Sequence, residues 1–508
     1  MVLVVCGLAL GATARNLCAQ DTRVVTEPKI PPVCVKLEAR LTATPDANGG
    51  KLRDEDEGKL DTERIQKALD GCGAGKAVEL AEGWGQEYPL QPVPAKKGAI
   101  ARSAKPIPTN AFLSGPLDLR EGVTLLIGKG VTLYASRDPK VFEMAKGSDP
   151  ARCGTSMPRP AAFPLFAMGA ARPSGGCRSL ININVKNSGV MGEGAVDGRG
   201  YARILGKDYT WWEMARKAQP NDDLYYTPRL IVASHADGLV LYGVHLNNSQ
   251  NFHVSVSQTN GFTAWGVHLD TPVNKALVGT GNDARNTDGI DPGTSQNITI
   301  AYSWIDNGDD NIAVKQGVSH MSVLHDHFYD GHGMSIGSET VLGQSFLVVD
   351  DLTEDHTTSG IRIKSNVKRG GPVHDLVYKN MCMRDVPIPI AISPYYTNQT
   401  VEPFEDPKYE GDKIPDYKGI VLENITSETP GDVLIAGLND QHRTQVTLEN
   451  VVVKGIQPSQ VHLDFVDITA KGAGANFPLV GKSVKVAKVG AGRPAAADPC
   501  KGKFVAYQ

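Results

Sequence analysis

The sequence predicts an all-β protein, a single-stranded right-handed parallel β-helix with a short N-terminal capping helix. Three observations support this fold. Short apolar stretches alternate with polar residues, similar segments recur at a fixed spacing, and clusters of Gly, Asn and Asp separate them. Alternation indicates strands and such clusters indicate turns. The chain of 508 residues has 54 glycines and only 6% aromatic residues, as expected for narrow stacked layers with many tight turns.

The repeat is clearest in two pairs of segments. GLVLYGVHL at residues 238–246 returns 23 residues later as GFTAWGVHL at 261–269. NITIAYSWIDNGDD at 297–310 aligns at the same offset with HMSVLHDHFYDGHG at 320–333. Related units occur at residues 180–197, 346–364, 376–392, 420–434 and 446–453. A β-propeller needs repeats of about 40 residues or more, so the spacing favours a solenoid whose coils bury their apolar faces on one another.

We expect one domain, residues 34–484, followed by a peripheral tail at 485–508. Residues 62–70 (TERIQKALD) have helical spacing after Asp61, a possible N-cap, and would cover the first coil. Residues 85–109 suggest a long surface loop rich in Pro, Lys and Ala, and residues 140–176 an irregular insertion. No linker divides the chain into independent domains.

The N-terminus suggests export. Residues 2–12 are apolar but too few to span a bilayer, and small and polar residues follow, with a cleavage site expected near Ala19. We therefore interpret residues 1–19 as a signal peptide of a secreted or periplasmic protein; a buried N-terminal strand is the alternative. No other segment is apolar enough for a membrane helix, and no membrane partner is expected.

Six cysteines follow the proposed signal peptide. An even number in an exported chain favours disulfides. Cys34–Cys72 and Cys153–Cys177 are local pairs, and Cys382–Cys500 is suggested as the third. No CxxC spacing occurs, which argues against a metal site built from cysteines.

The charge distribution limits the partners. A formal net charge of −4 argues against nucleic acid, because phosphate binding normally leaves a basic footprint. An anionic polymer would have to be attracted by a local basic cluster instead.

Four short motifs carry candidate chemistry. They are NTD at 286–288, GDD at 308–310, GHG at 331–333 and RIK at 362–364. Asp288 precedes Asp309 by 21 residues and His332 follows it by 23, so successive coils would place them on one side, roughly 4.7–4.9 Å apart. Glycosidic hydrolysis needs one carboxyl as acid and one as base, and crowding Asp288, Asp309 and Asp310 should raise the pKa of at least one.

Each motif alone has a simpler interpretation. Asp in a GDD is usually a turn residue, His332 can be a turn histidine, and Arg362 and Lys364 can form a solvated face. The four motifs in this order and at coil spacing are a much stronger signal.

With these motifs the chain resembles the polygalacturonases of glycoside hydrolase family 28, and NTDGIDP and GHGMSIGSE are similar to the bacterial members in particular. The similarity runs from about residue 34 to 453 and includes a tyrosine in ISPYY at 392–396. Asn311 replaces the cysteine often found after GDD.

The resemblance implies roles for the acidic motifs. Asp309 would be the general acid, and Asp288 and Asp310 would share activation of the water. The sequence does not say which of these two removes the proton. His332 would sit beside Asp309 and help to hold its proton. The family is inverting, which would agree with a gap of roughly 6.5–9.5 Å between acid and base.

It also implies substrate contacts. Arg362 and Lys364, two apart on one strand, would grip a substrate carboxylate, because Arg offers a bidentate fork and Lys a point charge. Tyr396 matches the family's tyrosine better than Tyr395. Asn286 would position sugar hydroxyls, and His253 would either line the cleft or be structural. No metal or cofactor is expected.

The expected function is hydrolysis of polygalacturonate, the pectin backbone of plant cell walls, by a monomer that acts within the chain. Exo action and hydrolysis of rhamnogalacturonan are the alternatives within the family. A pectate lyase would need calcium ligands and a basic proton acceptor instead of this acid-rich set. A non-catalytic polysaccharide-binding β-helix would have no reason to keep three acids and a histidine in register.

Overall fold

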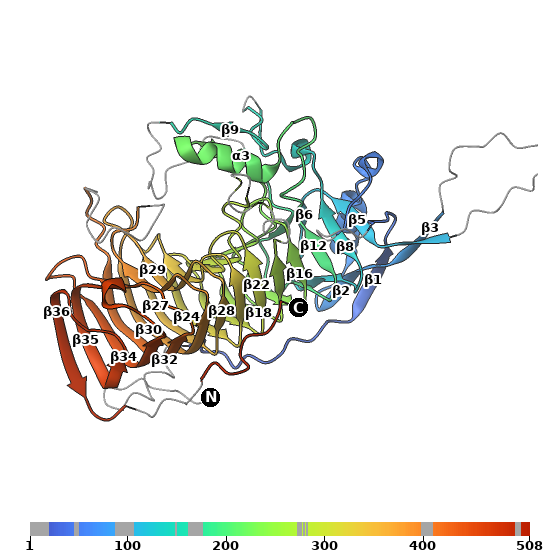
Figure 1. Cartoon of the computed structure of the whole chain (residues 1–508). Coiled ribbons are helices and arrows are strands. Elements are labelled where there is room, and N and C mark those ends of the chain that lie inside the picture. Colours follow the sequence, from blue (N-terminus) through green and yellow to red (C-terminus); the bar gives the residue numbers. More distant parts are fainter. Residues whose placement is uncertain are drawn as a thin grey trace, which may run out of the picture.

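The computed structural model describes residues 20–44, 50–86, 106–147, 150–160, 176–271, 277, 280, 283–397, 410–492 and 499–507. Their coils stack along one axis, from the blue N-terminal coils to the red C-terminal coils (Figure 1). Within these residues, 32 strands belong to one sheet, and its strand pairs are parallel. The predicted parallel β-helix is confirmed.

Each strand pairs with the strand one coil before and one coil after it, which produces three columns. The first, called the site column, contains β6 (Leu117–Asp118), β10 (Ile181–Ile183), β14 (Ile231–Ser234), β17 (Val254–Ser257), β20 (Ile290–Gly293), β23 (Ile312–Val314), β26 (Met334–Gly337), β29 (Ser359–Lys364), β31 (Ile388–Ser393) and β33 (Val433–Ala436).

The second column contains β1 (Val33–Glu38), β2 (Lys76–Ala81), β7 (Val123–Ile127), β11 (Gly189–Met191), β15 (Val240–Tyr242), β18 (Asn260–Trp265), β21 (Gln296–Ala301), β24 (Val318–Leu324), β27 (Gln344–Asp350), β30 (Pro372–Arg384), β32 (Asp416–Ser427), β34 (Thr444–Val453), β35 (Val461–Ala475) and β36 (Lys482–Val489). The third contains β5 (Ala111–Ser114), β8 (Thr132–Ala135), β12 (Ala195–Asp197), β16 (His245–Asn247), β19 (His268–Asp270), β22 (Trp304–Asn307), β25 (His327–Asp330) and β28 (Thr353–Asp355).

The core consists of side chains stacked in register between coils. In the site column Ile290 pairs with Ile312, Ile312 with Met334, and Met334 with Ile361, and all four are fully buried. Successive side chains of a strand point to opposite faces, so the residues between these positions point outward. The outer face of the site column is therefore available for polar residues.

Asparagines explain one set of bends between coils. Asn380, Asn424 and Asn450 each have φ 55°, in the left-handed region that Asn tolerates better than most residues. The Nδ2 of Asn424 donates to Oδ1 of Asn380 at 3.1 Å, and the Nδ2 of Asn450 donates to Oδ1 of Asn424 at 2.9 Å. The turn composition that indicated coils thus also ties neighbouring coils together.

The predicted helix is present as α2 (Thr62–Gly71). Ile65 and Leu69 are fully buried in the main core, and Thr62 Oγ1 accepts a hydrogen bond from the backbone N–H of Gly115 at 2.8 Å. Asp61 occupies the N-cap position but makes no side-chain capping bond there. The capping of the first coil by this helix stays a prediction.

All three proposed disulfides are present: Cys34–Cys72, Cys153–Cys177 and Cys382–Cys500. The last one fastens the C-terminal tail to β30. The coils continue through β36 to Val489, beyond the predicted boundary at residue 484. The tail then lies along the middle coils, where Tyr329 donates from its hydroxyl to the carbonyl of Val505 at 2.9 Å.

The insertions lie outside the three columns. The predicted loop at 85–109 begins and ends in strands, because β3 (Gly83–Gln86) pairs with β4 (Pro106–Thr109) antiparallel. In and after the insertion at 140–176, β9 (Ser156–Met157) pairs with β13 (Leu224–Tyr225), beside α3 (Trp211–Ala218) above the coils (Figure 1). Short 3₁₀ helices are η1 (Asp54–Asp56), η2 (Pro139–Phe142), η3 (Gln219–Asn221) and η4 (Pro458–Gln460).

The proposed signal peptide, residues 1–19, lies outside the described residues. No helix in the described part of the chain has the length and apolar character needed to cross a membrane.

Candidate active site

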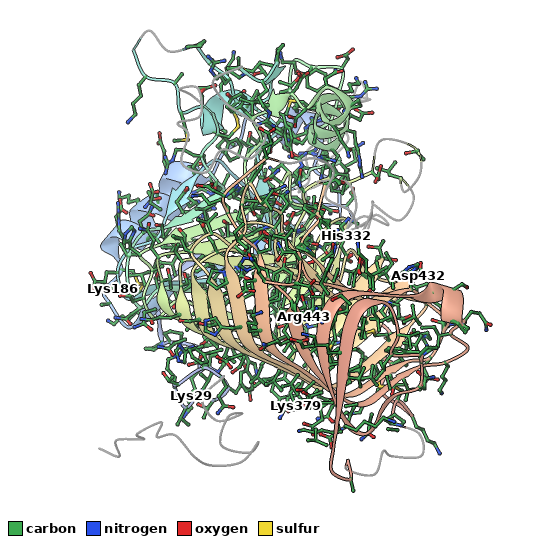
Figure 2. All side chains as sticks on the ribbon, turned by 90° about the vertical axis from the view of Figure 1, so that its left-hand side faces the viewer. Lys29, Lys186, His332, Lys379, Asp432 and Arg443 are labelled. Atoms are coloured by element: carbon green, nitrogen blue, oxygen red, sulfur yellow. A yellow bond between two sulfur atoms is a disulfide. The ribbon has the colours of Figure 1, made fainter. Side chains whose placement is uncertain are left out.

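The motif residues meet on three consecutive turns and one strand of the site column. Asp288 lies just before β20, Asp309 and Asp310 lie between β22 and β23, and His332 lies between β25 and β26. Arg362 and Lys364 follow on β29, where they pair with Ser335 and Gly337 of β26. His332 is on the upper side of the coils, the side that carries α3, whereas Lys379 is on the lower side (Figure 2).

Two glycines of the motifs are required by close packing. A Cβ on Gly308 would lie 2.5 Å from the carbonyl oxygen of Ala284. Gly331 has φ 63°, and a Cβ there would lie 2.7 Å from the carbonyl oxygen of Asp309. The first contact brings the turn that carries Asp309 against the turn that carries Asp288, and the second brings it against the turn that carries His332.

Buried amides fix the same turns. Asn311 Nδ2 donates to the carbonyl of Ile305 at 3.0 Å, and its Oδ1 accepts from the N–H of Gly333 at 2.8 Å. Asn307 Nδ2 donates to the carbonyls of Thr287 and Asp310, both at 2.9 Å. An amide can both donate and accept, so Asn311 binds two coils at once.

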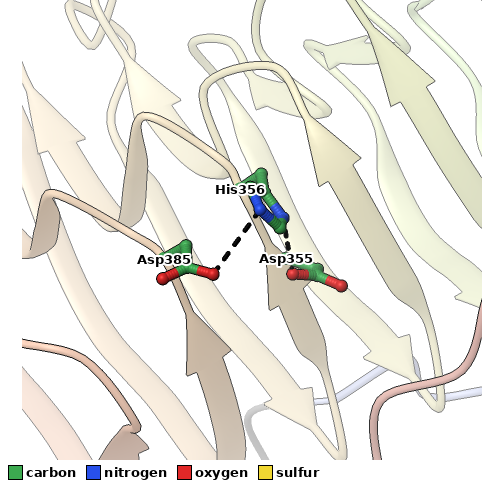
Figure 3. A group of neighbouring side chains, drawn as sticks. All are labelled: Asp355, His356 and Asp385. Atoms are coloured by element: carbon green, nitrogen blue, oxygen red, sulfur yellow. Dashed lines mark hydrogen bonds and ion pairs between the residues drawn. The ribbon is translucent and has the colours of Figure 1, made fainter.

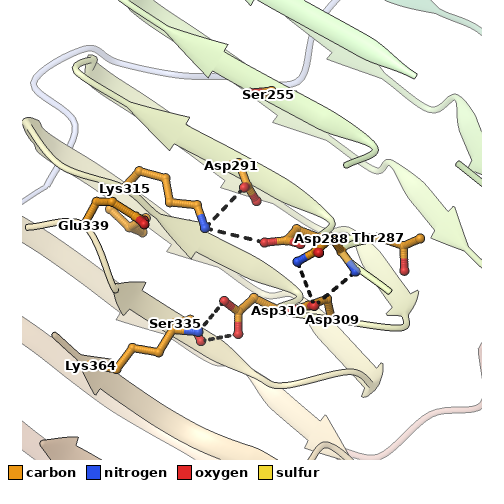
Figure 4. A network of polar contacts seen from close by, with 12 residues as sticks. Ser255, Thr287, Asp288, Asp291, Asp309, Asp310, Lys315, Ser335, Glu339 and Lys364 are labelled. Atoms are coloured by element: carbon orange, nitrogen blue, oxygen red, sulfur yellow. Dashed lines mark hydrogen bonds and ion pairs between the residues drawn. The ribbon is translucent and has the colours of Figure 1, made fainter. Parts of the chain in front are cut away.

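Asp310 is an ionised carboxylate surrounded by donors (Figure 4). Its Oδ1 accepts from Arg362 Nη1 and Ser335 Oγ, each at 2.7 Å, and its Oδ2 accepts from Lys364 Nζ at 2.7 Å. Burial raises the pKa of Asp310, but Lys364, Arg362 and Lys315 outweigh it and hold that pKa far below its usual range. These cations therefore favour the ionised form of Asp310.

Asp309 is less buried and lies at the groove. Its Oδ2 accepts from the backbone N–H of Asn286 at 3.2 Å and from Asn286 Nδ2 at 3.4 Å. Its Oδ1 accepts from the N–H of Asp310 at 2.9 Å. The side chain of Asn286 also accepts a short hydrogen bond from the hydroxyl of Tyr225, so Asn286 orients Asp309 within this structure.

His332 lies beside Asp309, as predicted. Its N–H donates to the carbonyl of Asp309 at 2.9 Å, and its Nδ1 is 2.7 Å from Thr358 Oγ1. Burial lowers the pKa of His332, which the nearby Asp309 carboxylate partly opposes. The neutral imidazole is favoured.

Asp288 belongs to a network that sequence reasoning missed. Lys315 Nζ is 3.5 Å from Asp288 Oδ2 and 3.4 Å from Asp291 Oδ2. Burial, Asp291 and Asp309 raise the pKa of Asp288 well above its usual value, and burial with Asp310 raises that of Asp291 to about 6 despite Lys315. The alternation of Ile290 and Asp291 across β20 was visible in the sequence; the pairing with Lys315 was not.

The tyrosine assignment agrees with the geometry. Tyr396 lines the groove, and its ring centroid lies 5.2 Å from Lys364 Nζ and 5.8 Å from the guanidinium carbon of Arg362. Tyr395 is buried and donates from its hydroxyl to the carbonyl of Leu438 at 2.9 Å. Cations beside an aromatic face are stabilised by its quadrupole.

His253 is not in the groove. It is fully buried, and its Nδ1 lies 3.2 Å from the carbonyl of Thr287 and 3.3 Å from that of Asp288. Burial lowers its pKa to about 4. Of the two roles considered for His253, the structural one agrees with this burial, because the imidazole lies within hydrogen-bond distance of two carbonyls of the NTD turn.

The carboxylates are closer than expected. One oxygen from each of Asp288, Asp309 and Asp310 lies within 4.8 Å of the other two. This is shorter than the gap of roughly 6.5–9.5 Å that we associated with inversion. One water can still bond two such oxygens, because two hydrogen bonds of about 2.7 Å reach across about 5.4 Å.

The site opens into a groove of about 1110 Å³. A second hollow of similar volume continues toward the N-terminal coils and shares Arg229, Phe252 and Arg285 with it. The groove is rich in cations despite the acidic chain. They are Arg216, Arg229, Arg285, Lys315, Arg362, Lys364 and Arg369.

A second cluster of titratable side chains lies beside the groove, which His356 helps to line (Figure 3). One ligand atom each of Asp355, His356 and Asp385 lies within 4.8 Å of the others. Asp355 also receives Arg384 Nε at 3.0 Å, and His356 Nδ1 is 2.7 Å from Asp355 Oδ1. The carboxylate of Asp355 is thus already paired with Arg384 and His356, and we assign no metal to the cluster.

Comparison with known proteins decides the family. The sequence model of glycosyl hydrolases family 28 matches residues 164–472. The chain belongs to glycosyl hydrolases family 28. It is thus a glycoside hydrolase, and the family 28 match contains every motif described above.

Relatives within family 28 cover most of the chain. An endo-polygalacturonase of Pectobacterium parmentieri is 38% identical over 448 residues, 87% of this chain and 92% of that protein. A polygalacturonase of Ralstonia solanacearum is 33% identical over 502 residues, 89% of this chain and 86% of that protein. The solved polygalacturonase from Erwinia carotovora ssp. carotovora has a TM-score of 0.62 and 35% identity, and the match covers 92% of this chain and 100% of that one.

Proposed function

We propose that this chain hydrolyses the α-1,4-galacturonosidic bonds of polygalacturonate. The observation that carries the proposal is the groove in which three carboxylates lie within 4.8 Å of one another and cations line the walls. The cations suit a polymer with a carboxylate on every sugar. The names of the relatives, endo-polygalacturonase and polygalacturonase, support the same substrate.

In the proposed reaction Asp309 is the general acid, because it is the least buried of the three aspartates and can reach a glycosidic oxygen. It gives its proton to the leaving oxygen as the bond from that oxygen to the anomeric carbon breaks. A water attacks the anomeric carbon and loses a proton to Asp288. The water oxygen becomes the new hydroxyl of the reducing end, and both aspartates re-equilibrate with solvent.

Asp288 is the better base of the two candidates left open by the sequence. Both oxygens of Asp310 accept from cations, and its pKa is far below the usual range, so it is a weak base. Asp288 Oδ1 accepts no hydrogen bond from the described residues, and Asp288 lines the groove. Asp310 instead holds Arg362 and Lys364 in place and orients the water.

Arg362 and Lys364 bind the substrate carboxylate with the donors that Asp310 leaves unused. Arg362 carries five N–H donors and Lys364 three. Tyr396 holds both cations against its ring, and His332 supports the protonated form of Asp309 from the neighbouring turn. Asn286 fixes the orientation of Asp309 and is within reach of sugar hydroxyls.

Action within the polymer chain fits a groove that continues past the reacting centre toward the N-terminal coils through Arg229 and Arg285. We also propose that the reaction inverts the anomeric configuration. This proposal rests on the family resemblance and not on the spacing of the carboxylates. Three disulfides support export, since such bonds persist in oxidising compartments. A monomer remains our expectation.

The test is the product spectrum from polygalacturonate. We expect new reducing ends, no ultraviolet-absorbing unsaturated ends, and mixed oligomers early in the reaction. Unsaturated ends would indicate elimination, and tight binding without new ends would indicate a non-catalytic protein. A single mono- or disaccharide would contradict endo action alone, and proton NMR of the first anomer formed tests inversion.

A further inference from the structure

Lys315 lies between two acids of the neighbouring coil (Figure 4). Asp288 stands just before β20 and Asp291 is within it, and Ile290 pairs with Ile312 at the start of β23. Lys315 directly follows β23, so its Nζ reaches back to both carboxylates, at 3.5 Å from Asp288 and 3.4 Å from Asp291. One ammonium therefore serves two carboxylates.

Both carboxylates that share the Lys315 ammonium are buried. Asp288 and Asp291 are each 3% exposed. Asp288 Oδ1 and Asp291 Oδ1 accept no hydrogen bond from the described part of the chain. A buried carboxylate without donors depends strongly on its nearest cation, and Lys315 is the cation that the structure places beside both.

We infer that Lys315 and Asp291 are positioning residues that set the charge at Asp288: Lys315 stabilises the ionised base, and Asp291 competes with Asp288 for that cation. The inference rests on the proposed function, in which Asp288 receives the proton of the water. It assigns a part in the reaction to two residues outside the four motifs.

The charges that face Asp288 come from several elements. Asp291 belongs to β20, Asp309 and Asp310 belong to the turn before β23, and Lys315 directly follows β23. Glu339, after β26, faces Lys315, and Arg229, before β14, faces Asp291. These last two charges act on Asp288 through its partners.

The expected signs follow from Coulomb's law. Removal of the Lys315 cation raises the pKa of Asp288, because the ionised form loses its attraction. Removal of the Asp291 anion lowers that pKa, because a repulsion disappears and Lys315 pairs with Asp288 alone. At separations near 3.5 Å a full charge shifts a pKa by about one unit even at high dielectric.

The experiment is the pH dependence of kcat on polygalacturonate for Lys315→Met and Asp291→Asn. The acidic limb reports ionisation of the base in the enzyme–substrate complex. We expect Lys315→Met to move that limb up by about one pH unit and Asp291→Asn to move it in the opposite direction, down. The double variant should return the limb toward that of the wild type, and Lys315→Arg should leave it close to the wild type.

Three results would overturn the inference. The first is a raised KM in Lys315→Met with an unmoved acidic limb, which would make Lys315 a substrate contact. The second is a shift of the alkaline limb instead, which would make Asp288 the acid. The third is movement of both single variants in the same direction, which would indicate a general structural defect; thermal melting of each variant identifies loss of folding.

Failure of the inference is distinguishable from failure of the proposed function. If the wild type releases no reducing ends, the proposed function is wrong. If the wild type releases them and the opposed limb shifts do not occur, only the positioning role is wrong. Lys315→Arg and Asp291→Glu, which keep the charges, extend the series where a neutral variant does not fold.

Discussion

Arg362 Nη1 donates a hydrogen bond of 2.7 Å to Asp310 Oδ1, although the two residues are 52 positions apart in the chain. Lys364 makes an equivalent bond to the other oxygen at 2.7 Å. The pair of cations expected to hold the substrate therefore also fixes one aspartate as an anion. In the proposed reaction the acid Asp309, the base Asp288 and the cation-binding Asp310 take different roles because their surroundings differ.

Asp309→Asn should abolish most activity while leaving the fold intact. An amide cannot donate the acid's proton, so turnover on polygalacturonate should fall by about 10²–10⁴-fold or more. Initial rates of reducing-end release measure this. Asp412→Asn, at a side chain that is 89% exposed, is the matched control and should keep the wild-type rate. Near-normal activity of Asp309→Asn would remove Asp309 from the role of acid.

Lys364→Ala should weaken both binding and turnover. It removes a contact for the substrate carboxylate and also one of the cations that hold Asp310. We expect a higher KM for polygalacturonate, a smaller effect on methyl-esterified pectin, and a lower kcat on both. Lys368→Ala, at an exposed lysine of the same segment that does not line the groove, is the control. Equal changes in KM on the two substrates would count against carboxylate recognition.

Coil spacing was enough to predict which motif residues meet. Asp288, Asp309 and His332 recur at the length of one coil, and stacked coils convert that spacing into contact. Arg362 and Lys364 are two apart on one strand and were therefore expected on one face, and both line the groove. These are local rules, and the structure obeys them.

The remaining features depend on contacts that spacing does not encode. Lys315 follows an ordinary strand, and only the packing of neighbouring coils places it between Asp288 and Asp291. His253 lies in a polar segment of the sequence, yet its side chain is fully buried. The C-terminal tail has no repeat, and its course follows from Cys500 and from the contact between Val505 and Tyr329.

Replacement of Cys382 and Cys500 by alanine should lower stability. The disulfide closes a segment with a sequence separation of 118 residues, and loop closure of that size contributes up to about 4–5 kcal/mol, with 2–4 kcal/mol typical. Urea unfolding should show a lower midpoint. Replacement of Cys153 and Cys177 by alanine provides the comparison. Their sequence separation is 24 residues, so this replacement should lower the free energy of unfolding by less. An unchanged midpoint for the first variant would contradict a stabilising role of the tail.

Glu354→Gln should change how stability depends on pH. Glu354 is fully buried, accepts one hydrogen bond from the N–H of Met334 at 3.1 Å, and burial raises its pKa to about 8. Between about pH 4 and pH 8 the folded state keeps a proton that the unfolded state loses, so wild-type stability falls as pH rises. The amide has no proton to lose, and the variant should be more stable than the wild type at about pH 8, by on the order of 1 kcal/mol or more.

Urea unfolding of wild type and Glu354→Gln at several pH values checks this sign. The two curves should converge near pH 4, with a small offset from the exchange of hydroxyl for amide. A variant that loses stability relative to the wild type as pH rises would show that Glu354 is ionised and well solvated in the folded protein.

The central claim, that water adds to the anomeric carbon in this groove, is tested most directly by digesting polygalacturonate in water enriched in heavy oxygen. We predict that mass spectra of the first oligomers show one heavy oxygen at each new reducing end, above the exchange seen with preformed oligomers in the same water. Oligomers without the label and with an unsaturated end would contradict the account.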